Sequence, residues 1–290
     1  MIDIVFIYAL LAATFPLEKV ALSYCSALFF STTRMLLGGV ILIGYARIVN
    51  KQRMHWSKND MSLLAILTVC NVFIPHLLPC WSLHYVQTSK AALMYNMTPF
   101  FAALYGQVFA QEQTTTKEWM GMLIGFYGLY VLLNIGNTHF CWADMTIVAT
   151  AAITVFGWQA MQKVSTRTAY SPAFANGVSM LCAGFIGLLF TLLLENQIPY
   201  SGKAISMLWY MIPVTLISNV FAYNYFNALL KRYSITLVSF VGFIVPVFVA
   251  FYGWIFCNEI PGTQFYVSLP IVCMGFVLFY YDKLFTQDVV

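Results

Sequence analysis

The sequence has 290 residues, of which 61% are hydrophobic and 8% are charged, and its formal net charge is +4. Soluble globular proteins carry about 25% charged residues, so this chain has too little polar surface to cover a water-soluble globule. The basic excess is small and lies in short connections, which excludes a nucleic-acid-binding domain and favours a protein embedded in lipid.

Apolar stretches of about 20 residues, the length that a helix needs to cross roughly 30 Å of hydrocarbon, follow one another along the chain. Helices are the expected form, because lipid cannot satisfy a backbone amide and the alternating pattern of a barrel is not found. The first stretch is expected to be a retained helix, since it lacks the basic start and the cleavage site of a signal peptide. The predicted spans cover residues 2–22, 26–48, 61–83, 88–110, 118–136, 141–162, 172–194, 206–229, 234–257 and 263–281.

Two segments of the chain repeat one another. Residues 99–128 and 246–275 align at a constant offset of 147 without a gap, and ten of the thirty positions are identical. Each half carries an odd number of predicted spans, so the second copy must cross the membrane in the opposite direction. The sequence therefore predicts an all-α integral membrane protein with ten transmembrane helices in two inverted five-helix repeats, residues 1–138 and 139–290.

Lysine and arginine predict the orientation. With a cytoplasmic N-terminus, ten basic residues fall on the inner side, whereas the outer loops and helix ends hold Lys19, Lys90 and Lys203. This asymmetry places both termini in the cytoplasm. We expect the bacterial inner membrane as the location.

Four ionisable residues, Glu18, Lys19, Arg34 and Lys90, lie within the predicted outer half of the first repeat. Ionisable groups are costly there unless they are paired, hydrated or able to reach the interface. In one interpretation Lys90 or Arg34 contacts a carboxylate or phosphate of the substrate. In the other, Glu18 pairs with Lys19 or Arg34 as a structural tie, while Lys90 extends to the headgroups. The second repeat lacks this cluster, which makes the predicted site asymmetric. The residues at the offset of 147 are Ser165, Leu181 and Leu237.

The third predicted helix holds His76, Cys80 and His84 at intervals of four residues. A metal site is not expected here, because Pro79 interrupts this face and the three side chains span about 12 Å of helix, whereas metal ligands must converge. Two interpretations of His76 stay open: it packs in the helix bundle, or it lines a cavity or transfers protons. No cofactor is expected.

Aromatic and amide side chains adjoin one another in the fourth, sixth and eighth predicted helices. Amides can bind α-amino and α-carboxylate groups without permanent charge, and flat rings can stack on a ring or hold a cationic centre. This chemistry suits an amino acid or a nucleoside-like ring. Together with Glu18, Lys90 and His76, the predicted substrate-binding residues are Tyr95, Asn96, Trp158, Gln159, Asn219, Tyr223 and Asn224.

Prolines interrupt the predicted helices at places that suit a moving bundle. Each proline frees a carbonyl and bends the helix, as expected of helices that rock around a central site. The predicted hinge residues are Pro75, Pro79, Pro99, Pro213 and Pro246.

Each half contains a helix with a proline in its first part and a glutamate at its end, followed by a small polar turn. Residues 88–92 (TSKAA) lead to Pro99 and to residues 109–112 (FAQE), and Pro246 leads to residues 256–259 (FCNE). This pattern resembles the EamA branch of the drug/metabolite transporter superfamily over essentially the whole chain. The resemblance implies a ten-helix bundle with alternating access to a central cavity, lined mainly by the first, third, fourth, sixth, eighth and ninth helices.

We therefore expect a secondary active transporter for a small zwitterionic or anionic metabolite. The cargo that we expect first is an amino acid or a derivative of one, and the resemblance implies export as the direction of transport. The alternative is uptake or exchange of a nucleoside-bearing metabolite such as S-adenosylmethionine, and a further alternative is a non-transport receptor or assembly subunit. The expected partners are the substrate and the bilayer, while protons, a counter-substrate and a monomeric or homodimeric state stay open.

An enzyme is not expected. Residues 55–60 carry the HxxxxD spelling of some acyltransferases, but they lie in a short basic loop without a surrounding globular fold. No nucleophile elbow, phosphate-binding loop or zinc-protease motif accompanies them, so acid–base and phosphoryl-transfer chemistry lack a set of residues to perform them.

Overall fold

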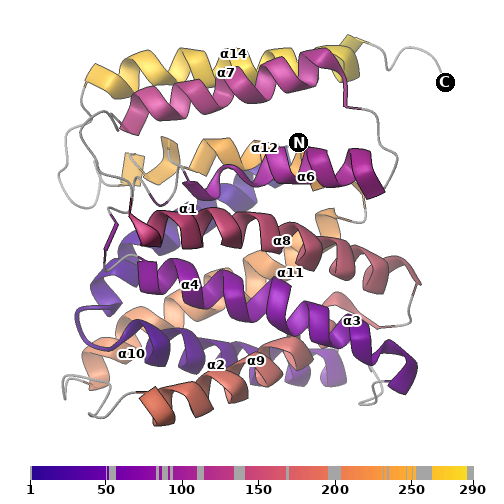
Figure 1. Ribbon diagram of the computed structural model, residues 1–290. Helices are drawn as coiled ribbons and strands as arrows, with labels where there is room; N and C mark the ends of the chain where they lie inside the picture. Colours follow the sequence, from indigo (N-terminus) through magenta and orange to yellow (C-terminus); the bar gives the residue numbers. More distant parts are fainter. Residues whose placement is uncertain are drawn as a thin grey trace.

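The computed structural model describes residues 2–49, 51, 57–82, 85–86, 91, 94–109, 114–133, 141–167, 170–194, 204–230, 232–233, 235–245, 247–249, 251–252 and 263–285. Its elements in these residues are helices that lie side by side in one bundle (Figure 1). They are α1 Ile2–Ala21, α2 Ala27–Ile48, η1 Lys58–Asp60, α3 Met61–Ile66, η2 Leu67–Phe73, α4 Ile74–Ser82, α6 Thr98–Phe109, α7 Thr116–Leu133, α8 Trp142–Arg167, α9 Pro172–Leu194, α10 Ala204–Val214, η4 Thr215–Ala222, α11 Tyr223–Leu229, α12 Ile235–Val241, η5 Gly242–Ile244 and α14 Thr263–Phe285.

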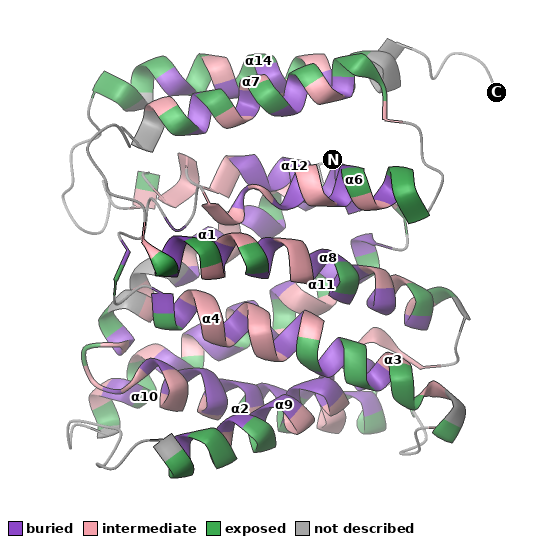
Figure 2. Cartoon of the chain, viewed as in Figure 1, coloured by how far each residue is buried: buried purple, intermediate pink, exposed green. Residues whose placement is uncertain are grey.

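Apolar side chains cover much of the outer surface of this bundle. Tyr266, Met274 and Val277 of α14, for example, are exposed. Figure 2 shows exposed positions along this helix in green. Such a surface is compatible with lipid and not with water, which confirms the predicted all-α membrane protein. The count of ten spans and their inverted arrangement stay predictions. Within the described part of the chain, four helices are long and apolar enough to cross a membrane: Ala27–Ile48, Met61–Ser82, Pro172–Leu193 and Ile205–Leu229.

Local hydrogen bonds define where several helices begin. The Ser26 side chain accepts from the amide of Phe29 at 3.1 Å and caps α2. At the start of α7, Thr115 Oγ1 accepts from the Glu118 amide at 3.2 Å, and Glu118 Oε2 accepts from the Thr115 amide at 2.9 Å. This reciprocal pair is a capping box, which satisfies two amides that a helix start would leave without partners.

Glycines allow two pairs of helices to pack closely, α2 against α9 and α7 against α14. A Cβ atom at Gly39 of α2 would lie 2.9 Å from the backbone nitrogen of Leu181, and one at Gly187 of α9 would lie 2.6 Å from Thr32 Oγ1. Small residues bring helix backbones together where lipid provides no hydrophobic drive for association. Figure 1 shows α7 and α14 at one edge of the bundle and α2 and α9 at the opposite edge. The sequence repeat aligns α7 with α14, and the same offset of 147 relates α2 to α9.

The predicted third and eighth helices each contain a π-helical segment, η2 and η4. Both lie close to prolines, since Pro75 and Pro79 follow η2, and Pro213 precedes η4. In a regular α-helix the amide of residue 75 would donate to the carbonyl of Asn71, but proline has no N–H. The Tyr223 hydroxyl from α11 donates to this carbonyl instead. The irregular part of the third predicted helix is therefore tied to the eighth predicted helix.

The substitution Tyr223→Phe tests this tie. It removes the hydroxyl donor and leaves a buried carbonyl without it, so we expect a loss of about 1 kcal/mol of stability and a fall of about 2–4 °C in Tm. Thermal unfolding of the purified protein measures the change. Tyr225→Phe on the same helix is the control, because Tyr225 is 37% exposed and its ring stacks on Phe221. Equal shifts in the two variants would contradict the tie.

The fourth predicted span is not one continuous helix. A turn at Asn96 and Met97 precedes α6, and Pro99 is the second residue of α6. A proline in the first helical turn breaks no internal hydrogen bond. The carbonyl of Tyr95 accepts from Thr98 Oγ1 at 2.5 Å. Pro99 thus begins a helix, whereas its predicted role was to bend one, and Pro246 lies outside the described residues.

Candidate functional site

A cavity of about 240 Å³ lies inside the bundle, between residues of α1, α2, α4, α6, α8, η4, α11 and α12. Most of its wall is apolar, with polar groups at separate points. Its aromatic lining residues are Tyr8, Tyr95, Trp158, Tyr223 and Phe226, and its polar or charged ones are Thr14, Glu18, Arg34, His76, Asn96, Thr98, Thr154, Ser218 and Ser239.

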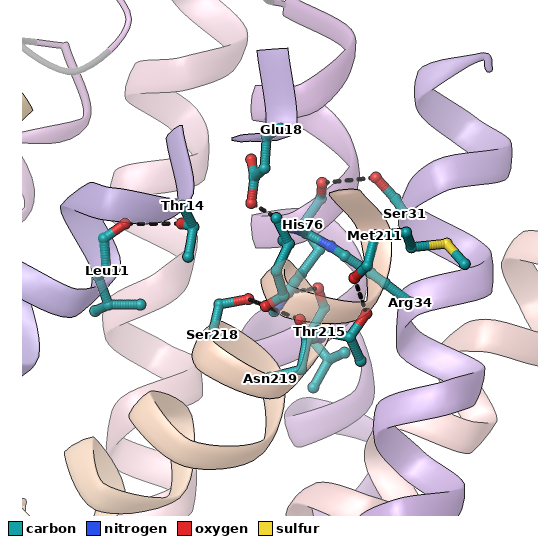
Figure 3. Close-up of polar contacts among 12 residues, drawn as sticks. Leu11, Thr14, Glu18, Ser31, Arg34, His76, Met211, Thr215, Ser218 and Asn219 are labelled. Carbon is teal, nitrogen blue, oxygen red and sulfur yellow. Dashed lines mark hydrogen bonds and ion pairs between the residues drawn. The ribbon is translucent and has the colours of Figure 1, made fainter. Parts of the chain in front are cut away.

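An ion pair lines one end of this cavity. Arg34 Nη1 from α2 donates to Glu18 Oε1 from α1 (Figure 3). The Glu18 side chain is 15% exposed and that of Arg34 is 6% exposed. The Arg34 guanidinium also lies 5.3 Å from the centre of the Phe30 ring, within range of a cation–π contact. The structure therefore places a carboxylate and a guanidinium together at a cavity wall inside the helix bundle.

His76 lines the same cavity and is held by its own helix. Its Nδ1 lies 2.8 Å from the Val72 carbonyl, one turn earlier, and its backbone carbonyl accepts from the Ser31 hydroxyl at 3.1 Å (Figure 3). Its ring lies 5.5 Å from the ring of Tyr223, edge to face. The described residues contain no group of three or more potential metal ligands, and His84 lies outside them.

Three of the five aromatic lining residues gather at the other end of the cavity, away from the ion pair. The Trp158 ring of α8 is 4.9 Å from the Phe226 ring of α11, and Phe226 is 6.1 Å from Tyr8 of α1. The Tyr8 hydroxyl donates to the Val238 carbonyl at 2.8 Å, which fixes this ring against α12. Tyr8 and Glu18 are ten residues apart in α1 and both line the cavity, so the aromatic and charged ends are separated by about 15 Å along this helix.

Most of the predicted binding residues line the cavity, and some lie elsewhere. Glu18, His76, Tyr95, Asn96, Trp158 and Tyr223 are among the lining residues. Gln159 is not. Asn219 is fully buried and accepts from the Ser218 hydroxyl at 2.8 Å, and Asn224 accepts from Asn176 at 3.2 Å. Contact of any of these residues with substrate stays a prediction.

Two predicted basic residues cannot be placed at the site. Lys90 lies outside the described residues, and Lys19 belongs to α1 with its side chain outside the described part. Of the four charges that the sequence singled out, the structure thus places Glu18 and Arg34 together, and the role of the pair as a structural tie or as a substrate contact stays a prediction.

Sequence reasoning missed several lining residues, including Tyr8, Thr14, Thr154 and Ser218. Sequence spacing offers a signal for three of them. Thr14 lies four residues before Glu18, and Thr154 lies four residues before Trp158, so each pair shares one helix face. Threonine is common in transmembrane helices, so a hydroxyl group on such a face does not by itself indicate a binding site. Tyr8 continues the face of Thr14 and Glu18 through Leu11, at spacings of three residues. Ser218 has no comparable signal, since only tertiary packing brings it to the cavity.

A family model described as the EamA-like transporter family matches residues 2–134 and 141–281. The chain belongs to this family. The match confirms the resemblance seen in the sequence, and membership in a transporter family favours a carrier over an enzyme.

Several relatives of this EamA-like protein have been named. It is 26% identical over 285 residues to the S-adenosylmethionine/S-adenosylhomocysteine transporter of Chlamydia muridarum. This alignment covers 94% of this chain and 88% of that protein. The transporter of the same name from Chlamydia trachomatis serovar D is also 26% identical, over 94% of this chain and 86% of its own. An uncharacterized transporter of Acidianus ambivalens is 27% identical over 76% of this chain and 80% of its own.

A protein of known crystal structure shares the fold. It superposes with a TM-score of 0.78 over 99% of this chain and 98% of its own, at 18% sequence identity. The likeness at this identity concerns the fold alone.

Proposed function

We propose that this EamA-like protein carries S-adenosylmethionine, S-adenosylhomocysteine or a similar nucleoside-bearing metabolite across a bacterial cytoplasmic membrane. The observation that carries the proposal is one cavity with an ion pair at one end and aromatic rings at the other. The names of the chlamydial relatives support the same cargo and a bacterial location.

The aromatic end suits a nucleoside. Trp158, Phe226 and Tyr8 provide flat faces and edges in a mostly apolar wall, and base-on-aromatic stacking contributes about 1–3 kcal/mol per base. The rings can also attract a sulfonium centre through a cation–π contact. Hydroxyl and amide groups such as Thr154 and Asn96 can bind the ribose hydroxyls.

An amino acid is the second candidate, and the Glu18–Arg34 pair is the observation that favours it. A free amino acid would occupy the charged end and leave the aromatic end without a partner. The relatives support the nucleoside-bearing cargo and offer nothing for amino acid export. We therefore rank the nucleoside-bearing metabolite above the amino acid, which reverses the order taken from the sequence.

The cavity volume of about 240 Å³ lies below the roughly 300–1,000 Å³ typical of small-molecule sites. An alternating-access carrier has to open this space to either side of the membrane. We propose that the third and eighth predicted helices bend at their π-helical segments, η2 and η4, of which η4 lines the cavity through Ser218. Exchange of the cargo against a demethylated counter-substrate needs no ion gradient. If transport is coupled to protons instead, Glu18 is the residue that we propose to bind and release the proton.

Counterflow in proteoliposomes tests the proposal without knowledge of the driving force. The vesicles are loaded with unlabelled S-adenosylmethionine, S-adenosylhomocysteine, adenosine or single amino acids, and accumulation of the labelled compound is followed against protein-free vesicles. We expect accumulation of S-adenosylmethionine, driven by internal S-adenosylmethionine or S-adenosylhomocysteine. Accumulation of amino acids alone would overturn the proposal in favour of the second candidate.

A further inference from the structure

The Glu18–Arg34 ion pair uses only part of its hydrogen-bonding capacity. A guanidinium has five N–H donors and a carboxylate has about four acceptor positions. The pair is joined by one hydrogen bond, from Arg34 Nη1 to Glu18 Oε1. Among the described residues, Arg34 Nε has no hydrogen-bond partner, although only 6% of the Arg34 side chain is exposed.

The second half of the chain carries no charge at the corresponding positions. At the offset of 147, the second repeat has Ser165 in place of Glu18 and Leu181 in place of Arg34. Leu181 packs against Gly39 at the interface of α9 with α2. An ion pair that served only to hold helices together would be expected to satisfy its donors, because a buried unpaired N–H is unfavourable. The spare donors of Arg34 and its place on a cavity wall indicate a ligand.

The position of the pair fits one end of an elongated substrate. Thr14 lies one turn from Glu18 toward the aromatic end, and its hydroxyl donates to the Leu11 carbonyl at 2.7 Å (Figure 3). Tyr8 follows at the aromatic end of the same helix, about 15 Å from Glu18. One face of α1 thus runs along the cavity from the charged end to the aromatic end.

We propose that the Glu18–Arg34 pair binds the α-amino and α-carboxylate groups of the substrate, while Trp158 and Phe226 contact its nucleoside. This proposal rests on the proposed function and adds the orientation of the cargo and the part that is recognised by charge. The N–H groups of Arg34 that do not bond to Glu18 donate to the α-carboxylate of the substrate, as guanidinium groups do in charge-assisted hydrogen bonds. Glu18 Oε2 accepts from the ammonium group, so the zwitterion adds to the ion pair without separating it.

Three competitors separate the parts of the substrate. S-adenosylhomocysteine keeps the nucleoside and both charged groups, decarboxylated S-adenosylmethionine lacks the carboxylate, and 5′-methylthioadenosine lacks the whole amino acid end. Loss of a hydrogen bond to a charged group corresponds to about a tenfold loss of affinity or more. In the wild-type protein we expect S-adenosylhomocysteine to inhibit uptake of labelled S-adenosylmethionine at concentrations at least about tenfold lower than the other two compounds. Equal inhibition by all three would overturn the proposal without any variant.

The substitution Arg34→Gln tests whether the Glu18–Arg34 pair distinguishes competitors that keep the amino acid end from those that lack it. We expect this variant to lose about tenfold or more in apparent affinity for S-adenosylmethionine, while inhibition by 5′-methylthioadenosine stays unchanged. The difference in apparent affinity between the two compounds is therefore smaller in the variant than in the wild type. Arg47→Gln is the matched control, because Arg47 lies in the last turn of the same helix and is exposed. Elution as one folded species in size-exclusion chromatography is required of both variants. Where Arg34→Gln does not fold, Glu18→Gln with the same competitors takes its place.

The outcomes separate this inference from the proposed function. A protein that carries amino acids alone, and loses them in Arg34→Gln, refutes the nucleoside cargo and leaves the role of the ion pair standing. A protein that carries S-adenosylmethionine but shows the same ranking of competitors in Arg34→Gln as in the wild type refutes the role of the pair and leaves the proposed function standing.

Discussion

Replacing Gly275 with leucine is expected to prevent the protein from accumulating as a folded species. A Cβ atom at this position of α14 would lie 2.6 Å from the backbone nitrogen of Gly125 and 2.8 Å from the carbonyl oxygen of Gly121, both in α7. Backbone atoms cannot move aside as flexible side chains do, so the two helices must separate. Overpacking typically costs about 1–3 kcal/mol, and separating a helix pair that depends on small residues raises this cost.

Gly44→Leu is the matched control for this prediction. Gly44 lies in α2, and a Cβ atom there would meet nothing within 4 Å. Fluorescence-detected size-exclusion chromatography of both variants measures the fraction that elutes as one folded species. Equal yields from Gly275→Leu and Gly44→Leu would show that α7 and α14 do not pack as closely as described.

Replacing Trp158 with leucine is expected to lower transport of S-adenosylmethionine by about tenfold or more. The Trp158 side chain lines the cavity, is 7% exposed and contacts Phe226. Loss of one stacking surface for a base corresponds to about 1–3 kcal/mol, or about one to two powers of ten in affinity. Trp158→Phe keeps an aromatic face and is expected to retain part of the transport.

Trp142→Leu provides the comparison for this second variant. Trp142 begins the same helix and is 85% exposed, away from the cavity. Initial rates of uptake into proteoliposomes, normalised to the inserted protein, measure the difference. Normal transport by Trp158→Leu, or the same loss in both variants, would remove Trp158 from the binding surface.

The general fold could be predicted from composition, but its local irregularities could not. Long apolar stretches predict that a segment lies in lipid as a helix, and α2, α9 and the segment from Met61 to Ser82 agree with the predicted spans. Such stretches do not specify the hydrogen-bonding pattern. The turn at Asn96 and Met97 and the π-helical segments depend on how prolines and side-chain hydroxyl groups redirect backbone bonds.

The site could be predicted in part, because charge inside a membrane is rare enough to draw attention. The sequence offers Glu18 and Arg34 as a possible pair, and they are joined in the structure. Sequence neighbours were less informative. Trp158 lines the cavity and Gln159 does not, since adjacent residues of a helix point about 100° apart. The names of the relatives favour the nucleoside-bearing alternative over the amino acid that the sequence places first, because amide and aromatic groups suit both cargoes.

A structure of the protein in lipid nanodiscs with bound S-adenosylmethionine tests the central claim most directly. We expect the ligand to lie in the cavity, with its adenine ring against Trp158 and Phe226 and its amino acid end within hydrogen-bonding distance of Arg34 and Glu18. A ligand bound outside this cavity, or bound with its adenine ring beside Arg34, would contradict the account.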